Sequence, residues 1–238
     1  MIASDALSRV VFAIYVPAAL LAFSDGMLVP TLPVFADSFG VSLALVGLVL
    51  AAESIGMLLA DGPAGYLVSR LRPKTAMLTG VGLVGAAVLG TALAPSLWLV
   101  VLTRVLCGAG FSLWSLSRHA YLTNVTHSAN RGRTMGLFGG VSRLGGFLGP
   151  AVGGAVAFWW GLRAPFLVYA CVVLLTLLLI VLLLPPEERP GGGRAGEKRA
   201  AARAALRRSA PVLVNAGTAQ LMVQMLRAGR RVLVPLYG

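Results

Sequence analysis

The chain has 238 residues, of which 58% are hydrophobic and only 12% are charged. An ordinary soluble domain carries about 25% charged residues, so this composition excludes a typical soluble protein and favours a membrane protein. The formal net charge of +12 raises nucleic acid as a partner. However, the basic residues lie in short gaps between apolar runs and in one linker, so we expect no nucleic-acid partner.

Seven apolar segments are long enough to cross a hydrocarbon core of about 30 Å, which needs about 20 residues per helix. They are residues 10–34, 45–68, 76–95, 97–117, 134–158, 164–184 and 211–236. The gaps between the first six are short, so consecutive helices are expected to be antiparallel neighbours. The predicted fold is an all-α membrane protein: a six-helix bundle followed by the first helix of a second, truncated half.

The first segment has two interpretations. It resembles a signal peptide with Ala22-Phe23-Ser24 as a cleavage site. Against this, Asp5 weakens the basic leader and the apolar run continues to Ala36, so an uncleaved first helix is favoured.

Loop charges predict the orientation of the chain in the membrane. With the N-terminus in the cytoplasm, Arg163 is the one basic residue in the outside loops, while the inside segments hold basic clusters. Lysine and arginine accumulate on the cytoplasmic side of membrane proteins, so we expect a cytoplasmic N-terminus.

A long connection divides the chain into residues 1–185, a basic cytoplasmic linker at 186–210, and residues 211–238. Within the linker, Arg199, Arg203 and Arg207 are four residues apart, which suits either a short basic helix on the anionic inner leaflet or a solvated linker.

A short internal repeat relates the first and last apolar segments. Met27-Leu28-Val29-Pro30 aligns with Val232-Leu233-Val234-Pro235, and this places Asp25 over Arg230. Transporters are often built from two such halves related by an axis along the membrane normal. The alignment therefore predicts that the last segment begins a second half and that the chain is a fragment or a truncated reading frame.

Three ionisable residues lie inside spanning segments at a common depth. Asp25, Glu53 and Arg104 each fall roughly 10–13 Å below the outer face at 1.5 Å per residue. Arg230 reaches a similar level by the repeat, and Arg143 is a separate intramembrane cation. Such charges cost about 2.5–3.5 kcal/mol each on insertion scales. They indicate either a structural ion pair or a polar cluster lining a water-filled cavity, where carboxylate protonation is coupled to substrate passage.

Glycines are concentrated in the fifth apolar segment. Gly145, Gly149, Gly153 and Gly154 fall largely on one helical face, and Pro150 removes a backbone donor from mid-helix. Such a face lets a neighbouring backbone approach closely and lets the helix bend. This composition is tolerated in a membrane bundle.

These motifs resemble the major facilitator superfamily and, within it, the drug:proton antiporters. The run from Gly145 to Gly154 is similar to that group's helix-5 antiporter motif, Gly-x-x-x-Gly-Pro-x-x-Gly-Gly. The run from Arg104 to Gly110 resembles its helix-4 motif, whose arginine the family implicates in proton transfer. Arg131-Gly132-Arg133 also resembles the family pattern before helix 5.

The family signature between helices 2 and 3 is matched only in part. Gly65, Arg70 and Lys74 fit this gating loop, whereas Ser69 replaces an acid that in the family helps hold the cytoplasmic side closed. Asp61, about two turns away, is interpreted as a gate or cap residue. The usual gating contact is therefore in doubt in this chain.

The resemblance implies a proton-coupled exporter of small amphipathic molecules that works by alternating access. It implies a plasma-membrane protein that is monomeric when full length, with a small-molecule substrate, protons and the lipid bilayer as partners. The high usage of alanine, glycine and arginine indicates a bacterial source. The proton gradient would supply the energy, with no cofactor. Symport, uniport and an inactive half-transporter remain open.

An enzyme is not expected. Ser112 and His119 are the conceivable nucleophile and base, but they lie two turns apart on one helix without triad geometry. No Gly-x-x-x-x-Gly-Lys-Ser/Thr loop is present, which disfavours an ATP-driven pump. Cys107 and Cys171 lie in apolar segments and predict neither a disulfide nor a metal site.

Overall fold

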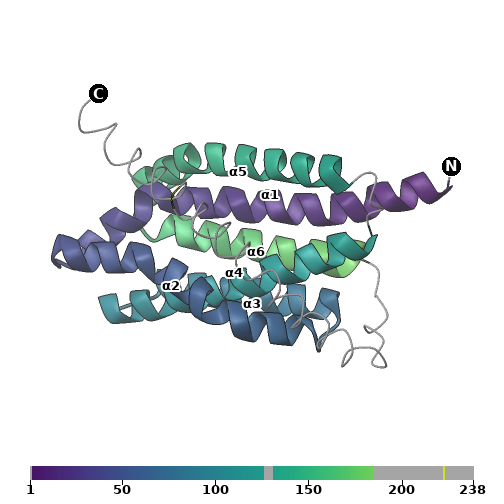
Figure 1. Ribbon diagram of the computed structural model, residues 1–238. Helices are drawn as coiled ribbons and strands as arrows, with labels where there is room; N and C mark the ends of the chain where they lie inside the picture. The colour runs from purple at the N-terminus through teal and green to yellow at the C-terminus, as the bar shows by residue number, and fades with distance from the viewer. Residues whose placement is uncertain (1, 126–130, 185–221, 223–238) are drawn as a thin grey trace. The chain divides into compact units, whose positions relative to one another are not determined.

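The structure is a computed structural model that describes residues 2–125, 131–184 and 222. The chain divides into two compact units, Met1–Pro190 and Gly191–Gly238, and the second is described only at Met222. The predicted span 211–236 and Arg230 therefore lie outside the described residues, apart from that one position. The first unit is a bundle of long α-helices (Figure 1). Its helices are α1 (Ile2–Asp37), α2 (Leu43–Val68), α3 (Pro73–Ala92), α4 (Leu97–Val125), α5 (Arg131–Trp160) and α6 (Ala164–Leu183).

Five of these helices are long and apolar enough to cross a membrane. They include residues 14–37 of α1, residues 97–122 of α4, and the whole of α2, α3 and α6. α5 has 30 residues and contains many glycines, Pro150 and Arg143. The all-α membrane fold predicted from the sequence is confirmed, and the chain is a multi-pass membrane protein.

Outside the α4–α5 connection, which is not among the described residues, short turns separate consecutive helices, and the local sequence explains two of these connections. Pro73 occupies the first turn of α3, where its missing N–H costs nothing. Gly161 has a φ of +88° in the turn between α5 and α6, a conformation that glycine adopts without strain. Only a few residues therefore connect α2 to α3 and α5 to α6.

Neighbours in the bundle are mostly not neighbours in the sequence. α1 packs along α5, α2 packs along α4, and both α1 and α3 pack on α6 (Figure 1). The consecutive pairs α1–α2, α2–α3 and α5–α6 touch only slightly. Among consecutive pairs, α3 and α4 alone have an extensive interface in the described part of the chain. The prediction that consecutive helices are neighbours was wrong for most pairs, because a short loop fixes direction while complementary small-residue faces select the partner.

The contact pattern has an internal symmetry. Exchanging α1, α2 and α3 with α4, α5 and α6 converts the α1–α5 interface into the α2–α4 interface, and the α3–α4 interface into the α1–α6 interface. With alternating directions, α1 and α4 run oppositely, so these pairings match the pattern expected of two three-helix repeats of inverted topology. α1 and α4 occupy equivalent places in it.

Glycines set the distance between α1 and α5. Gly145, Gly149 and Gly153 each lie against the α1 backbone, and a Cβ added to Gly145 would lie 2.6 Å from the carbonyl oxygen of Ala19. Gly154 faces open space, so it does not share this packed face. The predicted close approach is therefore correct for three of the four glycines. α5 passes through Pro150 as one helix.

Candidate functional site

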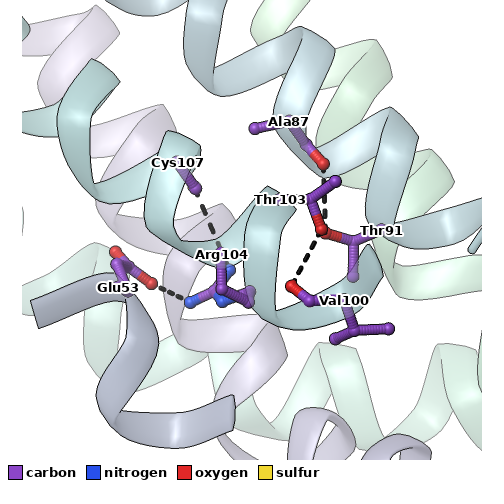
Figure 2. A network of polar contacts seen from close by, with 7 residues as sticks. All are labelled: Glu53, Ala87, Thr91, Val100, Thr103, Arg104 and Cys107. Atoms are coloured by element: carbon purple, nitrogen blue, oxygen red, sulfur yellow. Dashed lines mark hydrogen bonds and ion pairs between the residues drawn. The ribbon is translucent and has the colours of Figure 1, made fainter. Parts of the chain in front are cut away.

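An ion pair inside the bundle joins α2 and α4. Arg104 Nη2 contacts Glu53 Oε2, and the two side chains are only 5% and 13% exposed (Figure 2). Glu53 projects from α2 and Arg104 from α4, in two helices that carry few other charges. Charges in such surroundings are costly unless paired, so each group stabilises the other.

Gly108 explains how the ion pair forms. It lies one turn beyond Arg104 on α4, directly against the carbonyl group of Glu53, where a Cβ would overlap the α2 backbone. Gly56 on α2 makes the reciprocal contact with Val105. These two glycines bring the helix backbones together at the level of the charges, so both side chains meet without extending across a gap.

Polar neighbours surround the arginine on α4. Arg104 Nη1 lies 4.0 Å from the sulfur of Cys107, which is fully buried (Figure 2). Across the α3–α4 interface, the hydroxyls of Thr91 and Thr103 are 2.8 Å apart, and both also hydrogen-bond to carbonyl groups of their own helices. Both threonine hydroxyls thus have hydrogen-bond partners within this group, and their contact joins α3 to α4 beside the ion pair.

Asp25 belongs to the same electrostatic environment. It lies on α1 and interacts with Arg104, and Cys107 and Tyr169 of α6 are within electrostatic range of both. The structure therefore brings Glu53 and Arg104 into contact, with Asp25 near Arg104. α1, α2, α4 and α6 all contribute to this cluster.

Three buried polar atoms of the cluster region have no hydrogen-bond partner among the described residues. They are Ser24 Oγ, Arg104 Nε and the Tyr169 hydroxyl oxygen. Buried polar groups are nearly always satisfied, so these three atoms are exceptions to the general pattern. Ser24 and Tyr169 were missed from the sequence. The available signal was a hydroxyl beside Asp25 and a tyrosine in an otherwise apolar helix.

The two other predicted cations lie elsewhere. Arg143 is exposed on α5, and no described contact connects it with Glu53 or Asp25. Arg230 lies outside the described residues. The membership of both in a shared cavity therefore stays a prediction.

The predicted gating residues fall into separate contacts. Ser112 Oγ donates a hydrogen bond of 2.5 Å to Asp61 Oδ1, which links α4 to α2 at a second level. Lys74 Nζ donates to the carbonyl oxygens of Val181, at 2.9 Å, and Leu184. Lys74 thereby caps the C-terminus of α6, as basic side chains commonly do.

Gly65 and Arg70 lie on the exposed surface near the end of α2. No atom is within 4 Å of a Cβ built on Gly65, and the Arg70 guanidinium lies over the Tyr66 ring, 5.2 Å from its centroid. Ser69 donates to the carbonyl of Tyr66 at 2.7 Å, so its hydroxyl closes the helix end where the family has an acid.

The two residues considered for an enzyme have other partners. Ser112 is bound to Asp61, and His119 Nδ1 lies 2.7 Å from the carbonyl oxygen of Ser115. No group of three or more metal-ligating side chains occurs among the described residues.

Comparison with known proteins relates nearly the whole chain to one family. The family model described as Major Facilitator Superfamily matches residues 14–237. Multidrug resistance protein 2 of Bacillus subtilis is 26% identical over 149 residues, which cover 63% of this chain and 37% of that protein. Quinolone resistance protein NorA of Staphylococcus aureus is 22% identical over 151 residues, which cover 63% of this chain and 39% of that protein. The matches thus span less than half the length of these relatives.

Solved structures show the same fold. A peptide transporter POT variant in complex with alafosfalin superposes with a TM-score of 0.68 at 17% identity, over 89% of this chain and 50% of that one. A bacterial homologue of the human lysosomal transporter Spinster, inward-facing and unoccupied, gives a TM-score of 0.69 at 17% identity, over 78% of this chain and 44% of that one. On the match to the family model and this shared fold, the chain belongs to the major facilitator superfamily.

Proposed function

We propose that this chain is the N-terminal part of a secondary active transporter that exports small amphipathic molecules in exchange for protons. The proton gradient supplies the energy, with no cofactor. The protein resides in a bacterial plasma membrane with a cytoplasmic N-terminus and acts as a monomer when full length. Two relatives named for multidrug and quinolone resistance support export over uptake.

The observation that carries this proposal is the buried Glu53–Arg104 pair with Asp25 nearby. One arginine faces two carboxylates that differ in their contact with it. When a proton neutralises Glu53, the guanidinium loses its partner and interacts more strongly with Asp25. When the proton leaves, the original pair forms again. Such an exchange gives two charge arrangements for the transport cycle to use.

Packing within the bundle suggests which parts move together. α1 carries Asp25 and packs on α5 through Gly26 and three glycines of α5, while α4 carries Arg104 and packs on α2 through Gly56 and Gly108. A change in the attraction between Asp25 and Arg104 thus acts between these two helix pairs. In this proposal, Pro150 and Gly154, which do not form the glycine contact with α1, let α5 bend.

Proton-driven efflux by the full-length gene product in inverted membrane vesicles tests the function. An acidic lumen is expected to drive accumulation of ethidium in the wild type. Glu53→Gln, Asp25→Asn and Arg104→Ala are expected to abolish that accumulation. Asp37→Asn is the matched control, because Asp37 is an exposed carboxylate at the end of α1. Full activity in all three cluster variants would remove the assigned roles.

The direction of proton movement separates the remaining mechanisms. Antiport predicts that ethidium accumulation makes the lumen more alkaline. Symport predicts proton movement with the substrate, and uniport predicts none. A half-transporter without activity of its own predicts no accumulation by this chain expressed alone and accumulation by the full-length product.

A further inference from the structure

A groove opens between the facing ends of α5 and α6, away from the charged cluster. Its volume is about 450 Å³. These two helices touch each other only slightly, which leaves the space between them unfilled by their own side chains. The lining residues are Val156, Trp160, Arg163, Ala164, Leu167 and Val168. The walls are therefore apolar except at Arg163.

Arg163 lies at the end of the groove in the turn that begins with Gly161. Its Nη2 donates a hydrogen bond of 3.2 Å to the carbonyl of Ala94, which fixes the guanidinium beside the α3–α4 turn. The side chain is exposed, and no ion pair of Arg163 is found among the described residues. A guanidinium has five N–H donors, so further donors remain for an anionic group.

Exposed aromatic residues mark this end of the bundle as a membrane boundary. Phe158, Trp159 and Trp160 end α5 with exposures of 82%, 72% and 74%. Tryptophan is enriched where the hydrocarbon core meets the headgroups. The groove thus runs from the hydrocarbon region, along Val156 and Leu167, to a cation at headgroup level.

We propose that this groove binds one phospholipid with an anionic headgroup from the leaflet on the side of the α5–α6 turn. One acyl chain lies along the apolar walls, and the phosphate accepts hydrogen bonds from Arg163. Charge complementarity favours this occupant. A zwitterionic lipid offers a phosphate too, but the positive charge of its headgroup nitrogen offsets the attraction to the guanidinium, whereas an anionic lipid keeps its net negative charge. An apolar helix from another part of the protein would cover the groove but not the charge.

Brominated lipids test the proposal, because bromine quenches nearby tryptophan fluorescence. The chain has four tryptophans, at positions 98, 114, 159 and 160. Full-length protein with Trp160 alone, the others changed to Phe, is reconstituted in vesicles that contain brominated phosphatidylglycerol or brominated phosphatidylcholine. We expect phosphatidylglycerol to displace phosphatidylcholine at Trp160 with about five-fold preference, and Arg163→Gln to remove that preference.

Two controls make the result specific. Trp98 is also exposed and starts α4 near the same boundary, but it does not line the groove. Full-length protein with Trp98 alone is expected to show no headgroup preference. Ala164→Leu, which fills the groove, is expected to reduce quenching at Trp160 by both lipids. Equal preference at Trp98 and Trp160, unchanged preference in Arg163→Gln, or no quenching at Trp160 would each overturn the proposal.

Discussion

Removing one member of the Glu53–Arg104 pair is expected to destabilise the full-length protein far more than removing both. Arg104→Met leaves a carboxylate facing an apolar environment, and breaking a buried ion pair in this way typically costs about 3–5 kcal/mol. Both side chains are nearly buried in the structure, so water compensates little of that loss. Replacing the pair by apolar groups of similar volume removes both charges and is often neutral.

A double-mutant cycle measures this coupling. Arg104→Met, Glu53→Leu and the double variant are compared by thermal unfolding of the full-length protein in detergent. We expect each single variant to unfold at a clearly lower temperature than the wild type. The double variant is expected to unfold at a higher temperature than Arg104→Met, although Asp25 is left without its cation in both. Efflux is expected to be lost in all three variants. Stability requires only that neither charge is left unpaired, whereas proton coupling requires that both charged side chains are present. Additive effects of the two substitutions would refute the ion-pair account.

Three further perturbations follow from the packing and the interhelical hydrogen bonds. Gly149→Leu is expected to prevent stable expression, because a Cβ there would lie 2.7 Å from Gly26 Cα on α1, whereas Gly154→Ala is expected to express normally; equal yields would contradict the α1–α5 contact. Lys74→Met is expected to lower stability by about 1 kcal/mol through loss of the α6 cap, measured by thermal unfolding, with Arg72→Met as the exposed control. Ser112→Ala and Asp61→Asn are expected to lower efflux without changing expression, and the double variant is expected to be no worse than Asp61→Asn alone. Additive losses would show that the two side chains act separately.

The helices and their approximate ends could be predicted from the sequence, because apolar length and short polar gaps are local properties. Glu53 and Arg104 could be proposed as partners from their depth alone, since 1.5 Å per residue converts sequence position into height. Depth does not show which side of its helix a residue occupies. Height placed Asp25 level with the other two, but only the packing of α1 shows that it is near Arg104 without forming the ion pair.

The main feature that could not be predicted from the sequence is which helices pack against each other. A short loop fixes the relative direction of two helices, but it does not determine whether they pack against each other. The glycines on α5 carried the missing information, because a stripe at positions 145, 149 and 153 needs a backbone against it. Which backbone it meets depends on the whole bundle. The same holds for Lys74, whose acceptors on α6 are more than 100 residues away in the sequence.

The central claim is that the cluster exchanges protons as substrate binds. Proton release on addition of ethidium to purified full-length protein in weakly buffered solution tests it most directly. Wild type and Asp37→Asn are predicted to release protons on binding, and the Glu53→Gln/Asp25→Asn double variant is predicted to bind without releasing any. Undiminished release by the double variant would contradict the account.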